Sequence, residues 1–154
     1  MDTIIAPGRI KYITGEKKEG CIFCADSLRD DRLVLYKGEH CFVIMNKYPY
    51  TSGHLMVVPY RHIADIAEAS MEELIELMNL TGRAVDVLRK AFNPQGFNVG
   101  MNLGKAAGAG IDEHMHMHVV PRWFGDTNFV TVLGEVRVIP EEIEKTRDLL
   151  KSLF

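Results

Sequence analysis

The chain has 154 residues, a length that suits a single domain with its own hydrophobic core. With 47% hydrophobic and 25% charged residues, its composition is that of an ordinary globular protein. The net charge of -3 gives no reason to expect broad binding to nucleic acid or to a membrane, so any phosphate recognition must be local. No apolar run approaches the roughly 18 to 20 residues of a membrane span, and residues 1–20 lack a secretory pattern. We therefore expect one cytoplasmic domain over residues 1–154, with an N-terminal arm over residues 1–20.

Short β-rich runs predict about five strands, and two of them form a hairpin around the polar residues 38–40. The predicted strands cover residues 32–38, 41–46, 54–59, 97–101 and 115–121.

Two helices are predicted. Ser70 and Glu73 form a capping box, and residues 93–96 end the helix that follows. Its apolar residues keep helical spacing: Met71, Leu74, Met78, Val85 and Leu88. A second helix is expected over residues 140–154, with Pro140 near its first turn and acidic residues leading. The fold class is α+β: an antiparallel sheet with one long internal helix and a C-terminal helix.

The three cysteines are Cys21, Cys24 and Cys41. An odd number without an export signal favours a reducing cytosol over a disulfide scaffold. The first two form a CxxC pair, for which a redox pair and half of a zinc site are both possible. No thioredoxin-like βαβ pattern surrounds the pair, so we favour zinc, which needs two further ligands. Cys41 is expected to be a small core residue and His40 to be solvated at the hairpin.

Three histidines, His114, His116 and His118, alternate with methionines at the start of the last predicted strand. Alternate residues of a strand share a face, so the imidazoles should line one surface about 6 to 7 Å apart. The other side chains should enter the core: Met115, Met117 and Val119. We therefore expect accessible imidazoles rather than buried core histidines.

Such a row suits either a metal site or a nucleotidyl-transfer site, in which a neutral imidazole attacks phosphorus. The glycine-rich loop over residues 102–113 favours the second, because its backbone N–H groups can approach phosphate oxygens. Asp112 and Glu113 stand at unhelpful spacing for a catalytic metal.

The string HMHMHVV, from His114 to Val120, fits the signature of the histidine triad (HIT) superfamily of nucleotide hydrolases and transferases. The resemblance runs from Cys21 to Trp123 and includes, in the family's order, CIFC, MNKYPYTSGHLMVVPYRH and NLGKAAGAG. The string HVVPRWFGDTNF is most similar to the diadenosine polyphosphate phosphorylase branch. The resemblance implies a HIT-like fold, a homodimer and nucleotidyl transfer from a dinucleoside polyphosphate such as diadenosine tetraphosphate, with phosphate or water as acceptor.

By the same resemblance, His116 is the nucleophile that attacks the α-phosphorus and forms a nucleotidyl-imidazole intermediate. His118 contacts phosphate oxygens, and His54 supports the triad from a neighbouring strand. Zinc, in a structural role, is held by the CxxC pair together with His62 and His114. No catalytic metal is required.

Substrate-binding positions also follow from the family pattern. Asn46 holds the ribose, and three apolar residues pack against the base: Ile22, Phe23 and Ile44. Phosphates meet a loop that includes Asn102, Gly104, Gly108 and Gly110. The chain departs from the pattern here, because its loop is one residue longer and Gly110 stands where relatives often have a hydroxyl. Backbone N–H groups or Lys105 are the expected substitutes, and the preference for a leaving group stays open.

Three alternatives remain. The first is hydrolysis of nucleoside phosphoramidates or mixed anhydrides by water. The second is a non-catalytic nucleotide-binding module whose zinc stabilises the fold. The third is a metal-dependent hydrolase built on the three histidines, in which a chelator would abolish activity without unfolding the chain.

Overall fold

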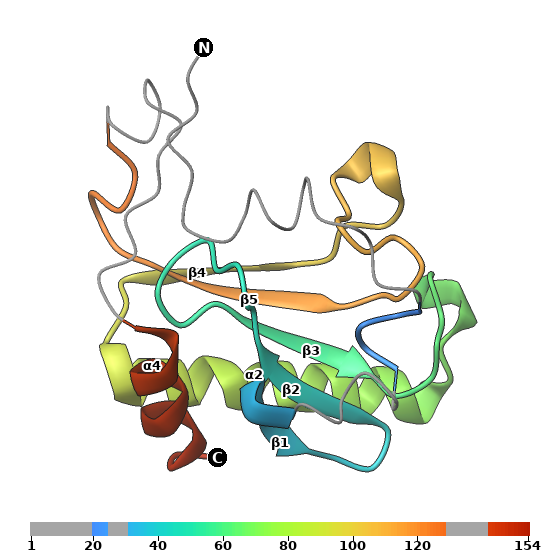
Figure 1. Ribbon diagram of the computed structural model, residues 1–154, viewed down its shortest axis with the longest axis horizontal. Helices are drawn as coiled ribbons and strands as arrows, with labels where there is room; N and C mark the ends of the chain where they lie inside the picture. The colour runs from blue at the N-terminus through green and yellow to red at the C-terminus, as the bar shows by residue number, and fades with distance from the viewer. Residues whose placement is uncertain (1–19, 25–30, 129–141) are drawn as a thin grey trace.

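The computed structural model describes residues 20–24, 31–128 and 142–154. Five strands form one sheet in the order β1-β2-β3-β5-β4, and every neighbouring pair is antiparallel (Figure 1). The strands are β1 (Val34–Lys37), β2 (Cys41–Met45), β3 (Leu55–Pro59), β4 (Gly96–Gly100) and β5 (Met117–Arg122). The predicted antiparallel sheet of five strands is confirmed. The predicted N-terminal arm lies outside the described residues, apart from Gly20.

Two α-helices of the described residues pack with the sheet: α2 (Met71–Phe92) and α4 (Ile143–Lys151). The predicted capping box starts α2, because the Ser70 hydroxyl accepts the Glu73 N–H and the Glu73 carboxylate accepts the Ser70 N–H. The helix ends at Asn93, which adopts a left-handed conformation (φ 46°). Residues 140–141, at the predicted start of the last helix, lie outside the described part of the chain. No described helix has the length and apolar character needed to cross a membrane.

The buried face of α2 contains only part of its apolar series: Leu88 is buried, and Leu74 and Val85 are half-buried. Met71 and Met78 are 67% and 57% exposed. The buried residues are Glu73, Leu77, Leu80, Thr81, Ala84, Val87 and Leu88. Apolar side chains occur on more than one side of this helix, so periodicity predicts the helix without deciding which side meets the sheet.

The two faces of the sheet are covered differently. Helix α2 runs along one face, against β2, β3 and β5, and α4 lies beside α2 and β1 (Figure 1). That side holds the main core, which includes Val57, Val119 and Leu88. A smaller buried cluster contains Phe23, Val34, Phe42, Met56 and Val58, and we call it the second core. His118 stands opposite Met56 in the register of β3 and β5, which places this histidine on the side of the second core.

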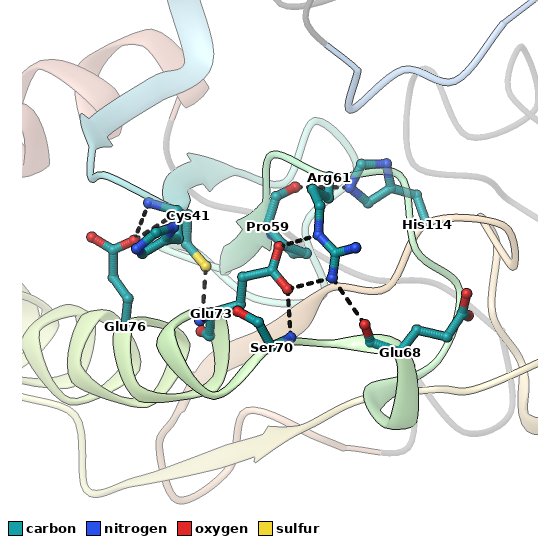
Figure 2. Close-up of polar contacts among 9 residues, drawn as sticks. Cys41, Pro59, Arg61, Glu68, Ser70, Glu73, Glu76 and His114 are labelled. Atoms are coloured by element: carbon teal, nitrogen blue, oxygen red, sulfur yellow. Dashed lines mark hydrogen bonds and ion pairs between the residues drawn. The ribbon is translucent and has the colours of Figure 1, made fainter.

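Helix α2 is also tied to the β1–β2 hairpin through Glu76. The Glu76 carboxylate accepts the backbone N–H groups of Glu39, His40 and Cys41. Figure 2 shows Glu76 facing Cys41 from helix α2. Cys41 is fully buried, as predicted for a core residue, and burial raises the pKa of its thiol to about 12. His40 is half-buried rather than solvated, because this contact draws the hairpin onto α2.

Candidate active site and metal centre

The three imidazoles of the histidine segment are buried, which corrects the predicted open face. His114, His116 and His118 are 0%, 6% and 9% exposed. The ring of Phe23 lies over the first two, with centroid distances of 5.6 Å to His114 and 5.2 Å to His116. The Tyr50 ring stacks on His118 at 5.7 Å. Aromatic side chains from distant segments therefore cover the histidine row.

The histidine row begins before the strand β5 that carries its last member. β5 starts at Met117, so His118 belongs to the strand while His114 and His116 lie in the residues that precede it. This freedom from the ladder leaves the His114 carbonyl available to a side chain, and His116 uses it.

His116 has a defined tautomer. Its Nδ1 lies 2.9 Å from the carbonyl oxygen of His114. A carbonyl can only accept, so Nδ1 carries the proton and the lone pair of the neutral ring is on Nε2. Burial lowers the pKa of His116, although the bond to the carbonyl raises it. The resulting ring is a base and a nucleophile at Nε2 only.

A chain of donors sets the tautomers of His54 and His118. The Tyr50 backbone N–H donates to Nδ1 of His54 (3.1 Å), so His54 must carry its proton on Nε2. That Nε2–H then donates to Nδ1 of His118 (2.8 Å). His118 is left with its own proton on Nε2. Burial, with a smaller contribution from His116, lowers the pKa of His118 to about 4, so this ring is neutral at pH 7.

The turn between β2 and β3 presents the Tyr50 amide to His54. Asn46 supports this turn twice, because its N–H donates to the His54 carbonyl and its Oδ1 accepts the Tyr48 N–H (2.8 Å). The Thr51 hydroxyl donates to the Pro121 carbonyl at the far end of β5. Half-buried Asn46 thus serves as a turn residue in this structure.

Four side chains meet as a candidate metal centre: Cys21, Cys24, His62 and His114. Their ligand atoms all lie within 4.8 Å of one another. The Cys21 sulfur is 3.2 Å from Nδ1 of His114, and the Cys24 sulfur is 3.2 Å from Nδ1 of His62. Two thiolates and two imidazoles around tetrahedral zinc would stand about 3.6 Å apart, so the donor set and its spacing fit.

The tautomer of His114 also suits a ligand. Its Nε2 lies 2.8 Å from the Pro59 carbonyl, so Nε2 carries the proton and Nδ1 offers its lone pair to the centre (Figure 2). Burial raises the pKa of Cys21 to about 11, although N–H groups of Phe23 and Cys24 act in the opposite direction. A bound cation would displace the thiol protons.

The glycine-rich loop leaves the sheet beside the histidine row and returns to it. Gly100, at the end of β4, pairs with His118, and the loop rejoins the row at His114. Gly104 and Gly108 have φ of 80° and 88°, values that side-chain-bearing residues rarely adopt. Around them the loop forms the short helix η4 (Lys105–Ala107) and is largely exposed. Within the loop, the backbone N–H groups of Ala107 and Ala109 donate to the Gly104 carbonyl, and that of Gly108 donates to the Lys105 carbonyl.

The loop also carries a charge pair and an apolar contact. Lys105 Nζ lies 3.8 Å from the Asp112 carboxylate. Ile111 packs against the second core, as does half-buried Ile44. Of the three residues predicted to face a base, Phe23 and Ile44 lie in this one cluster, whereas Ile22 is exposed.

Sequence reasoning missed three groups of this site: Tyr50, the Pro59 carbonyl and Ile111. A backbone carbonyl or amide has no sequence signal, because every residue supplies one. The aromatic ring of Tyr50, four residues before His54, was visible, but only the turn geometry shows that it packs on two histidines.

Comparison with known proteins identifies the family to which this sequence and fold belong. The model described as the HIT domain matches residues 28–125. This chain belongs to the HIT family. The HIT protein is 46% identical over 123 residues to AP-4-A phosphorylase of Mycobacterium tuberculosis, covering 80% of this chain and 63% of that protein. It is 27% identical over 121 residues to a bis(5'-nucleosyl)-tetraphosphatase (asymmetrical) of Schizosaccharomyces pombe, with 79% and 63% covered. The chain therefore spans about 63% of the length of these two relatives.

A solved structure shares the fold. The crystal structure of a Zn-bound histidine triad family protein from Mycobacterium smegmatis superposes on the HIT protein with a TM-score of 0.70 and 30% identity. The match covers 87% of this chain and 92% of that one. The predicted family and α+β fold are thus confirmed.

Proposed function

We propose that this HIT protein transfers a nucleotidyl group from a dinucleoside polyphosphate, such as diadenosine tetraphosphate, to phosphate or water through a covalent bond to His116. One observation carries the proposal. Hydrogen bonding leaves a lone pair on Nε2 of His116, while the adjacent His118 is left with a proton on Nε2. A nucleophile beside a donor is the pair that attack on a phosphate ester needs. The names of the two curated relatives support the substrate class.

In the first step, Nε2 of His116 attacks the α-phosphorus. The nitrogen–phosphorus bond forms as the bond to the bridging oxygen breaks, and that oxygen leaves with the electron pair as part of a nucleoside polyphosphate. The substituted ring is cationic. Its Nδ1–H stays bonded to the His114 carbonyl, which stabilises that charge, and His118 donates to the phosphoryl oxygens.

In the second step, an oxygen of phosphate or water attacks the same phosphorus. The phosphorus–nitrogen bond breaks, its electron pair returns to Nε2 of His116, and the acceptor's proton passes to solvent. Phosphate as acceptor gives a nucleoside diphosphate, and water gives a monophosphate. Protonated His116 is a good leaving group because its positive charge is lost on departure.

The binding sites follow the family pattern. Phe23, Ile44 and exposed Ile22 form the base side, and Asn46 holds the ribose. The phosphates meet the glycine-rich loop: Asn102, Gly104, Gly108 and Gly110. Support comes from the positive φ of two of these glycines and from the Lys105 ammonium on the same loop.

We further propose that zinc occupies the centre formed by Cys21, Cys24, His62 and His114. The four side chains supply all four ligands of a tetrahedral shell, so no position would be open to substrate and the metal would be structural. It would hold three segments together that are distant in sequence. The Zn-bound relative supports this assignment. Thiol ligands need a reducing compartment, which agrees with the expected cytoplasm.

A homodimer is the proposed assembly. Within the described residues, nothing pairs with the outer edge of β4, and Val99 on that strand is exposed. Helix α2 adds an exposed apolar stripe of Met71, Ile75 and Met78. Open edges and apolar stripes of this kind are usually covered in stable proteins.

Product analysis with diadenosine tetraphosphate tests the activity. The protein is incubated with this nucleotide with and without inorganic phosphate. ADP plus ATP in the presence of phosphate means phosphorolysis, and AMP plus ATP means hydrolysis; either outcome supports nucleotidyl transfer. If the folded protein binds nucleotide but releases no product from this compound, the proposed activity is wrong.

A further inference from the structure

We infer that the metal centre and the nucleotide site are coupled, so that zinc and a nucleoside monophosphate each strengthen binding of the other. The coupling runs through His114 and Phe23, which each belong to both sites. This inference rests on the proposed function and on the proposed metal, and it gives the metal a role beyond support of the fold.

His114 provides the first link, because its ring and its backbone serve different sites. Nδ1 of the ring points at the Cys21 sulfur (3.2 Å), and Nε2–H is held by the Pro59 carbonyl. The carbonyl of the same residue accepts Nδ1–H of His116 (2.9 Å). A metal that fixes the ring of His114 therefore also restrains the group that orients the nucleophile.

Phe23 provides the second link, because it lies between the two cysteines of the metal turn. The turn is tight, with the Cys24 N–H donating to the Cys21 carbonyl (3.2 Å). From this turn, the Phe23 ring reaches both His114 and His116, at 5.6 Å and 5.2 Å between centroids. The ring is 2% exposed and packs in the second core, beside the proposed base site. Ordering the turn thus orders a wall of the nucleotide site.

Coupling of this kind is reciprocal. If zinc pre-orders Phe23 and His116, a nucleotide that needs them ordered binds more tightly to the zinc-loaded protein. Linkage then requires the nucleotide to tighten zinc binding by the same factor. Couplings between sites are typically about 5- to 150-fold, so a factor of at least about fivefold is expected here.

The experiment measures zinc affinity by competition with a chromophoric chelator, with and without saturating AMP. AMP affinity is measured in parallel on zinc-loaded and zinc-stripped protein. We expect AMP to tighten zinc binding at least about fivefold, and zinc to tighten AMP binding by the same factor. Neither readout depends on turnover.

Two matched variants test whether the coupling between zinc and AMP runs through Phe23. Phe23→Leu keeps all four metal ligands, so it should still bind one zinc, but the coupling factor should fall toward one. Phe42→Leu makes the same change in the second core at a ring that packs on Tyr60, and it should keep the wild-type factor. If Phe23→Leu does not fold, the reciprocal factors of the wild-type protein decide the question.

The failures are distinguishable. If zinc and AMP both bind and neither affects the other, the coupling is wrong while the proposed function stands. If AMP does not bind, the coupling is wrong, and product analysis with diadenosine tetraphosphate decides separately whether the proposed function stands. If zinc does not bind, it falls together with the metal assignment alone.

Discussion

Each imidazole of the triad segment has a hydrogen-bond partner that decides which of its nitrogens carries the proton. The Pro59 carbonyl takes the Nε2 proton of His114, and the His114 carbonyl takes the Nδ1 proton of His116. A backbone amide, acting through His54, leaves the proton of His118 on Nε2. Three chemically identical side chains thereby acquire the forms of a metal ligand, a nucleophile and a donor.

The role of His116 is tested by His116→Asn. The asparagine amide can still donate to the His114 carbonyl, so the fold and nucleotide binding should persist. Turnover should fall by several orders of magnitude, because the nucleophile is gone. A quenched wild-type reaction should show the chain plus one nucleotidyl group, bound by an acid-labile phosphorus–nitrogen bond. Near-wild-type turnover in the variant, or a label on His118, would show that the roles are wrongly assigned.

The depressed pKa of His118 predicts loss of stability in acid. In the unfolded chain an imidazole titrates near its ordinary pKa of 6.5, but burial holds the folded value at about 4. Between these pH values the unfolded chain binds more protons, so the free energy of unfolding should fall as the pH drops from about 6.5 to about 4. Urea unfolding across this range measures the slope. His118→Asn should make the slope shallower, and an unchanged slope would count against a neutral buried His118.

At the scale of elements, the start of α2 organises the segment that follows β3. Arg61 makes two hydrogen bonds to the Glu73 carboxylate (2.7 and 2.8 Å) and one to the Glu68 carbonyl (Figure 2). Glu73 also closes the capping box with Ser70. This contact anchors the chain between Pro59, whose carbonyl holds His114, and the helix. The Arg61–Glu73 contact therefore helps to hold the Pro59 carbonyl in place, and through it His114, which belongs to the metal centre and whose own carbonyl orients His116.

Glu73→Gln tests this anchor. The bond to Arg61 lowers the pKa of Glu73 to about 2, so its charge contributes stability above about pH 4.5 that is lost as the pH falls toward 2. At pH 7 the variant should lose about 1 kcal/mol, a modest value because the Arg61 side chain is half-exposed. Chemical unfolding measures the difference. Glu72→Gln, at the exposed neighbouring position, is the control, and equal losses in the two variants would contradict a specific role for Glu73.

At the scale of the whole molecule, the metal centre joins parts of the chain that are far apart in sequence. The cysteine turn, His62 after β3 and His114 before β5 meet there. A structural metal contributes folding free energy, because the unfolded chain has no preformed site. The purified protein should carry about one zinc per chain. Cys24→Ser should lower both the metal content and the melting temperature, as metal analysis and thermal unfolding would measure.

Cys41→Ala is the control for this experiment. Cys41 lies in the main core and is not one of the four ligands, so its loss should lower the melting temperature and leave about one zinc per chain. The metal claim would be abandoned if the wild-type protein contained no zinc and Cys24→Ser melted at an unchanged temperature. The expected single domain over residues 1–154 and the homodimer stay predictions.

Much of the fold and of the candidate site was predictable from the sequence by itself, because the signals are local. The capping box at Ser70 marks the start of α2, alternation marks the strands, and the spacing of the histidines carries the family resemblance. The tertiary structure decided what depends on distant partners: which side of α2 is buried, how far the imidazoles are covered, and which nitrogen of each carries a proton. His114 owes its tautomer to Pro59, and His54 owes its own to the Tyr50 amide. Backbone groups are the same at every residue, so only their placement in space makes them specific.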